Sequence, residues 1–232
     1  MEVKNKNTDN IRTAVSHERR DFLKAGITIA AAPIFAGIAS TVLPTKAQAA
    51  RKNAMSKNIL IISASPRENS NSDLLSDEFM RGAKAAGHNV EKIRLSEKEI
   101  NCCTGCCSCI GNQGSCVQED DMNEILEKIL AADVMVLASP VYFLSFNGQM
   151  KTFIDRVCPI YTMIHDKEVY FVVSCAGGKR SVDSIVQSFR VFTGCLHGIK
   201  EKGIISITGV WDESAAKGSP ALKQAYTMGL NA

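Results

Sequence analysis

Short apolar runs alternate with amphipathic helical patterns from residue 58 to the end of this 232-residue chain. A short apolar run between polar segments is typical of a strand that is buried on both faces of a parallel sheet. We expect five such strands, at 58–63, 90–95, 133–138, 168–174 and 203–208. Helical spacing of apolar residues predicts helices at 74–87, 122–130, 185–196 and 220–230. The alternation predicts an α/β fold in which helices cover both faces of a five-stranded parallel sheet.

The first 49 residues have the features of an export signal rather than of a folded segment. Arg19-Arg20 followed by Asp-Phe-Leu-Lys resembles a twin-arginine signal, and residues 25–43 are mildly apolar. Ala47-Gln-Ala49 has the small-x-small form of a cleavage site. The alternative is a retained membrane anchor, although Gly, Pro and Thr make the apolar run weakly hydrophobic. We expect cleavage of residues 1–49, export to the periplasm, and no membrane attachment afterwards.

Removal of this segment changes the charge balance of the protein. The full chain has 27 Lys and Arg against 24 Asp and Glu, and residues 1–49 hold seven of the basic and four of the acidic ones. The remaining 183 residues are therefore formally neutral and suit one domain. We expect no binding to nucleic acid, since the apparent basicity belongs to the signal.

A dense cysteine segment, 102–116, interrupts the alternation after the second expected strand. Its core reads C-x2-C-x2-C-x6-C and places four thiols close together, at Cys103, Cys106, Cys109 and Cys116. Four thiolates in one segment are what a [4Fe-4S] cluster needs. Zinc is the second possibility, and free or disulfide-forming thiols are the third. Cys102 and Cys107 lie in the same segment, so the choice of ligands is ambiguous.

The first polar loop follows the first expected strand. In such sheets, ligands bind beyond the carboxyl ends of the strands. Hydroxyl, amide and guanidinium groups at the start of a helix favour an anion such as phosphate. Those of the loop are at Ser65, Arg67, Asn71 and Ser72. The alternative is an ordinary polar turn with a helix cap.

Two further loops are expected at the same edge. Residues 139–143 carry Tyr142 and Phe143, which can pack against a planar ring or merely close the end of the sheet. Residues 175–178 include two adjacent glycines, which permit close approach of the backbone to a ligand, or form a plain turn. Cys175 is interpreted as a small buried side chain rather than a redox group.

Taken together, four motifs resemble the NADPH-dependent FMN reductase superfamily, and most of all its iron–sulfur flavoprotein branch. These motifs are 65–72, the cysteine segment leading into 120–122, 138–143 and 151–156. The resemblance implies a flavodoxin-like three-layer α/β/α sandwich over residues 50–232, with the cysteine segment 102–116 as an insertion. It implies a dimer or tetramer. It also implies FMN held at the phosphate by Ser65, Arg67, Asn69, Asn71 and Ser72, and at the ring by Pro140, Val141, Tyr142, Phe143, Ala176, Gly177 and Gly178.

We therefore expect an exported FMN-dependent oxidoreductase or electron-transfer protein with a cluster, in which the flavin carries the chemistry. Export separates it from cytoplasmic NAD(P)H, so a quinol or a redox protein is the expected partner, with NAD(P)H as a transient donor the alternative. No P-loop or dinucleotide fingerprint is present in the sequence. The other possibilities are an NAD(P)H-dependent reductase without a cluster and a non-enzymatic metal-binding or carrier protein.

Overall fold

The computed structural model describes residues 56–112 and 114–232 of the chain. The predicted export signal over residues 1–49 lies outside the described residues. Among the residues described, no helix combines the length and the apolar character needed to cross a membrane.

Five parallel strands form the sheet, in the order β2-β1-β3-β5-β6. This order confirms the predicted flavodoxin-like α/β fold, because the chain crosses from one side of β1 to the other between β2 and β3. The strands are β1 (Asn58–Ser63), β2 (Asn89–Arg94), β3 (Val134–Tyr142), β5 (Glu168–Ser174) and β6 (Lys200–Ile207).

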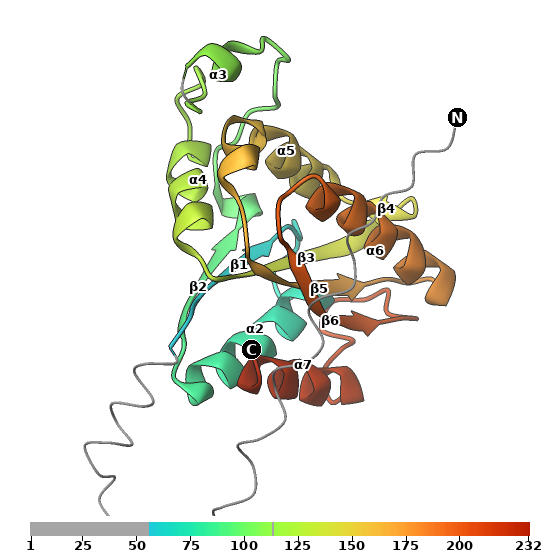
Figure 1. Cartoon of the computed structure of the whole chain (residues 1–232). Helices are drawn as coiled ribbons and strands as arrows, with labels where there is room; N and C mark the ends of the chain where they lie inside the picture. Colours follow the sequence, from blue (N-terminus) through green and yellow to red (C-terminus); the bar gives the residue numbers. More distant parts are fainter. Residues whose placement is uncertain (1–55, 113) are drawn as a thin grey trace, which may run out of the picture. The chain divides into compact units, whose positions relative to one another are not determined.

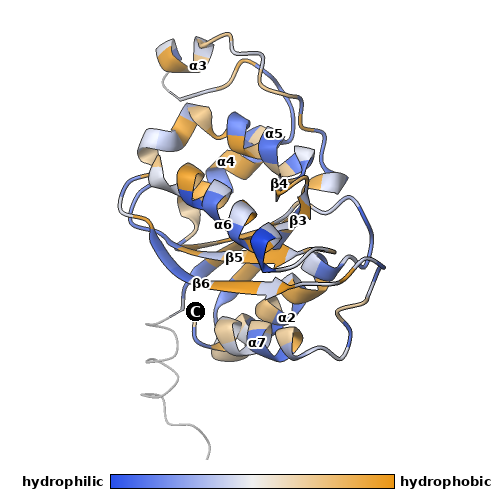
Figure 2. Ribbon diagram, turned by 90° about the vertical axis from the view of Figure 1, so that its right-hand side faces the viewer, coloured by the Kyte–Doolittle hydropathy of each residue, from blue (hydrophilic) through white to orange (hydrophobic). Residues whose placement is uncertain are grey.

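Helices cover both faces of this sheet. Helices α2 and α7 lie on one face, and α4, α5 and α6 lie on the other (Figure 1). Side chains of β1 alternate between the two cores: Leu60 and Ile62 pack with the α4–α6 side, and Ile59 and Ile61 with the α2–α7 side. Figure 2 shows the apolar strands between the two helical layers. The helices are α2 (Asn71–Ala86), α4 (Met122–Ala131), α5 (Gly148–Arg156), α6 (Lys179–Gly194) and α7 (Pro220–Leu230).

Several boundaries differ from the sequence prediction. Strand β3 continues through Tyr142 and pairs with the short antiparallel strand β4 (Ser145–Phe146), so most of the expected 139–143 loop is strand. Pro140 made this extension hard to predict, because proline is uncommon within strands. Helix α5 was not predicted as a helix. Helix α6 begins at Lys179 rather than near 185. The prediction missed its start because the first turn is mostly polar and exposed and so lacks the apolar spacing of a helix.

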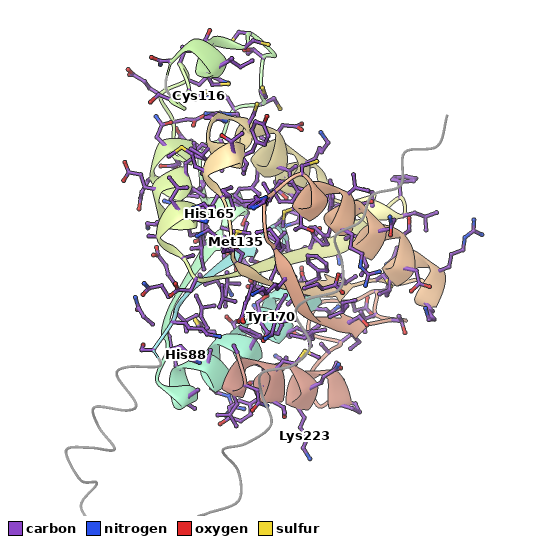
Figure 3. The ribbon with its side chains drawn as sticks, viewed as in Figure 1. His88, Cys116, Met135, His165, Tyr170 and Lys223 are labelled. Carbon is purple, nitrogen blue, oxygen red and sulfur yellow. The ribbon has the colours of Figure 1, made fainter. Side chains whose placement is uncertain are left out.

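Three short helical turns complete the described part of the chain: η1 (Leu95–Glu97), α3 (Ser108–Gly111) and η2 (Cys158–Met163). Helix α3 belongs to the cysteine segment, which extends beyond α4 and α5 in Figure 1. In Figure 3, Cys116 lies in this projecting segment, whereas Met135 and Tyr170 lie in the strands of the sheet.

Candidate functional site

A cavity of about 410 Å³ lies at the carboxyl edge of the sheet, where β1, β3, β5 and β6 end. It is the place where a parallel sheet of this order binds a ligand. Eight of the twelve residues predicted to hold a flavin line it: Ser65, Arg67, Asn71, Pro140, Val141, Tyr142, Phe143 and Ala176. Six further residues complete the lining: Ser70, Ser174, Cys175, Val210, Trp211 and Glu213.

One end of the cavity is polar and adjoins the start of helix α2. The side chain of Ser70 caps this helix by accepting a hydrogen bond from the Asp73 N–H at 3.2 Å. Within the described residues, no hydrogen bond is formed by the N–H group of Asn71, which lines the cavity, so it is available to an anion. Arg67 adds a guanidinium at the same end.

Asn71 uses its side chain to hold the loop that follows β6. Its Nδ2 donates to the carbonyl of Asp212 at 2.9 Å, and its Oδ1 accepts from the Ala216 N–H at 2.8 Å. Arg67 reaches the same loop, because its Nη1 donates to the carbonyl of Trp211 at 3.1 Å. The first loop and the last loop therefore form one wall of the cavity.

The other end of the cavity is apolar and ends in a strained hairpin. Phe143 and Leu144 form the two-residue turn between β3 and β4, with φ of 48° and 64°. Turns of this kind normally contain Asn or Gly, since a large side chain at positive φ costs about 1 kcal/mol or more. The Phe143 side chain is fully exposed at this turn, beside the cavity. Backbone strain of this kind tends to occur at functional sites.

Four predicted flavin residues do not line the cavity. Asn69 is exposed at φ 51°, and its carbonyl accepts from the Ser214 N–H. Ser72 is buried inside the first turn of α2. Gly177 accepts hydrogen bonds from the Cys175 thiol and the Gly209 N–H, and Gly178 precedes helix α6. Their assignment to the flavin stays a prediction.

Two titratable groups, Cys175 and His165, lie on either side of β5. Cys175 is 5% exposed and donates to the Gly177 carbonyl at 3.2 Å, and burial raises the pKa of its thiol. Its thiol is therefore neutral at pH 7, in keeping with a packing role. His165 lies before the start of β5, at the opposite end of the strand from the cavity, and pairs with Asp166.

The four predicted ligand cysteines line a second, smaller hollow of about 30 Å³. Cys107, Cys158 and Arg156 line it too. Within the described residues, no three groups meet at a point that would hold a single metal ion. Four thiolates suit a [4Fe-4S] cluster or a tetrahedral zinc ion in number and chemistry.

Electrostatics in this hollow differ between its thiols: they favour the thiolate of Cys106, whereas burial and neighbouring thiols raise the pKa of Cys158. Hydrogen bonds from Ser108 lower the pKa of the Cys106 thiol from 9.0 to about 7. The Arg156 guanidinium, 1% exposed, lies beside Cys116 and forms a two-pronged ion pair with Asp120 at 2.6 and 2.9 Å.

Residues 57–208 match the NADPH-dependent FMN reductase family. The chain belongs to this family. An iron–sulfur flavoprotein of Archaeoglobus fulgidus is 45% identical over 98 residues, which are 42% of this chain and 44% of that protein. An iron–sulfur flavoprotein of Methanocaldococcus jannaschii is 40% identical over 102 residues, 44% of this chain and 52% of the other. The matches thus span about half the length of these curated relatives.

Solved structures share the fold. An NAD(P)H:quinone oxidoreductase from Methanothermobacter marburgensis has a TM-score of 0.61 at 20% identity, over 76% of this chain and 96% of that one. An FMN-dependent NADH-azoreductase from Bacillus anthracis in complex with FMN has a TM-score of 0.56 at 18% identity, over 76% and 97%. At these identities the likeness shows the fold alone.

Sequence reasoning missed three parts of these two sites. The loop after β6, with Val210, Trp211 and Glu213, lines the cavity, and its position after the last strand was the signal that could have identified it. Cys158 lines the thiol hollow although it lies far from the cysteine run. Arg156 was noted only as part of a family motif, and its pairing with Asp120 has no local sequence signal.

Proposed function

We propose that this protein is an FMN-dependent oxidoreductase of the iron–sulfur flavoprotein type. The observation that carries this proposal is the cavity at the carboxyl edge of the sheet. It is polar and cationic at the start of α2, and apolar along Pro140 and Val141. This division suits a molecule with a phosphate at one end and a planar ring at the other. The names of the matched relatives support the same assignment.

The residues of the cavity would bind and orient the cofactor. Arg67 and the free N–H group of Asn71 at the start of α2 would hold the phosphate, and the strand end at 140–142 would flank the ring. Bound FMN supplies the chemistry of taking up an electron pair and releasing electrons singly. Trp211 and Phe143 lie at the mouth of the cavity, where a quinol or redox protein would approach.

We extend the proposal to a [4Fe-4S] cluster in the cysteine segment. The sequence assigns it to Cys103, Cys106, Cys109 and Cys116, and all four line one hollow. A second candidate function is NAD(P)H-dependent reduction of a quinone, flavin or other small acceptor without a cluster. The names of the solved structures favour it. The homo-oligomer implied by the resemblance stays a prediction.

The test is an anaerobic visible spectrum of the purified full chain, with assays of released flavin, iron and acid-labile sulfide. We expect flavin bands above a broad thiolate–iron absorption. Flavin without iron would favour the reductase lacking a cluster, and bleaching by NAD(P)H would identify its donor. A folded, colourless protein would contradict the flavin assignment and favour a metal-binding carrier.

We also propose that the protein is exported by the twin-arginine route. Replacing Arg19 and Arg20 together by lysine should leave the protein in the cytoplasmic fraction, because that route is specific for the paired arginines. Cell fractionation with immunoblotting measures this. The matched control replaces Lys4 and Lys6 by arginine and should leave export unchanged. Equal distribution of the wild type and the Arg19→Lys/Arg20→Lys variant would contradict the proposal.

A further inference from the structure

Arg94 ends strand β2, beside the loop that carries Arg67. In the sheet it is the register partner of Ser63, the last residue of β1, after which this loop begins. The side chain of Arg94 is half-buried, and its Nη2 donates to the carbonyl of Arg67 at 3.1 Å. Strand β2 contributes no residue to the lining of the cavity, yet it is joined through Arg94 to the middle of the predicted phosphate loop.

The loop itself has few other contacts that would hold Arg67. Residues 66–69 are exposed, and the N–H of Arg67 donates only to Ser65 Oγ, within the loop, at 3.3 Å. The carbonyl of Asn69 accepts from the Ser214 N–H. Among the described residues, Arg94 forms the only hydrogen bond from outside the loop to the backbone of Arg67. Loss of that bond would free the backbone at a residue that lines the cavity.

Two acidic groups hold the Arg94 guanidinium in place. Its Nη1 donates to Glu97 at 2.7 Å, and its Nε lies 3.6 Å from Oδ2 of Asp73. Asp73 is buried in the first turn of α2 and accepts from the Ser63 hydroxyl at 2.8 Å. Two carboxylates thus already balance the charge of Arg94. We therefore expect Arg94 to act through its contact with Arg67 rather than by attracting phosphate itself.

Lys92 lies two residues earlier on β2 and provides a comparison within the same strand. Its Nζ pairs with Asp73 at 2.8 Å and with Asp77 at 2.6 Å. Lys92 therefore shares the buried carboxylate with Arg94. Among the described residues, no hydrogen bond joins Lys92 to the loop of Arg67. The two side chains thus distinguish support of helix α2 from support of the loop.

We propose that Arg94 is a positioning residue for the cofactor. It fixes the backbone of Arg67 and thereby places the Arg67 guanidinium at the phosphate end of the cavity. The proposal rests on the FMN of the proposed function. Without Arg94, the loop would have to be ordered when FMN binds, and ordering the backbone of one residue weakens binding about fivefold or more. A ligand without a phosphate would not require this order.

The test measures the dissociation constants of the flavin-free full chain for FMN and for riboflavin by fluorescence titration. We expect Arg94→Ala to weaken FMN binding about fivefold or more, up to the effect of Arg67→Ala, and to leave riboflavin nearly unchanged. Lys92→Ala is the matched control and should bind both ligands as the wild type does. Arg94→Lys should recover part of the FMN affinity, because lysine can donate to a carbonyl but lacks the fork that also reaches the carboxylates. Circular dichroism reports folding.

A double variant tests whether Arg94 acts through Arg67. In an Arg67→Ala background, Arg94→Ala should cause no further loss of FMN affinity, because the side chain that it positions is absent. Wild-type FMN affinity in Arg94→Ala, a further loss in that background, or an equal loss of riboflavin would overturn the proposal. An equal loss of FMN affinity in Lys92→Ala would overturn it too. A wild-type protein that binds neither flavin would refute the proposed function itself, and this inference with it.

Discussion

Replacing Arg156 by methionine should lower the free energy of unfolding by about 3–5 kcal/mol, the usual cost of removing one partner from a buried ion pair. The side chains of Arg156 and Asp120 are 1% and 3% exposed. The variant would leave the Asp120 carboxylate buried without its cation. Urea unfolding followed by circular dichroism measures the change.

The Asp120–Arg156 ion pair also holds the cysteine segment in place. Asp120 accepts from the N–H of Asn101 at 3.0 Å and from the N–H of Met122 at 3.1 Å. Asp120 thus joins the residues that precede and follow the cysteine segment. Arg156, at the end of α5, binds both Asn101 and Asp120 and so anchors the two ends of the segment to that helix. Loss of Arg156 should loosen the segment that contains the thiols.

Two variants provide the controls. Lys151→Met removes an exposed i,i+4 partner of Asp155 on the same helix and should cost about 0.5 kcal/mol or less. The double variant Asp120→Asn/Arg156→Met removes the stranded charge and should recover part of the stability. An Arg156→Met variant no less stable than Lys151→Met would show that the pair contributes little.

The same pair predicts a dependence on pH. Burial opposes the charged form of Asp120, but hydrogen bonds from Arg156, Asn101 and Met122 outweigh it and lower its pKa. Because the pKa of Asp120 is lower in the folded protein, its carboxylate contributes fully to the free energy of unfolding above the unfolded-state pKa of about 3.9. That contribution is lost as the pH falls through the pKa of Asp120 in the folded protein. The double variant should therefore lose less stability than the wild type on acidification below pH 4.

The sheet was predictable from sequence because its strands carry continuous apolar runs. Ile59 to Ile62 are all buried, and a short continuous apolar run of this kind is typical of a parallel strand that is covered on both faces. The polar loop at 65–72 was predictable for a related reason, since it lies between a strand and a capped helix. Eight predicted flavin residues line one cavity because all of them follow strand ends or form them.

The contacts between distant segments were not predictable in this way. Asp120 and Arg156 are 36 positions apart, and only the packing of α4 and α5 beside the sheet brings them together. Cys158 joins the thiol hollow for the same reason. The strained turn at Phe143 and Leu144 contradicts local preference, so no single-residue propensity would place a turn there.

Replacing Arg67 by alanine should weaken FMN binding by about tenfold or more, since hydrogen bonds to charged groups contribute about 1.5–3 kcal/mol. Arg67 lies at the polar end of the cavity, near the start of α2. Without this charge, the phosphate would be held by Ser65 and by the N–H group of Asn71 alone. Fluorescence titration of the flavin-free protein with FMN measures the dissociation constant.

Arg67 also donates to the carbonyl of Trp211, so the variant has a second possible effect. Riboflavin separates the two effects, because it has the same ring as FMN and no phosphate. If Arg67 holds the phosphate, the variant should weaken FMN and leave riboflavin nearly unchanged. If Arg67 acts by positioning the loop after β6, both ligands should weaken equally, which would contradict the phosphate assignment.

Two further variants test whether FMN binding depends on the geometry of the Arg67 guanidinium and on its position in the cavity. Arg67→Lys keeps the positive charge but loses the two-pronged geometry, so it should lie between the wild type and Arg67→Ala. Arg180→Ala, an exposed arginine in the first turn of α6 that does not line the cavity, should bind FMN as the wild type does. An interaction of Arg67 with the phosphate would be ionic, so the difference in FMN affinity between the wild type and Arg67→Ala should narrow as salt is added.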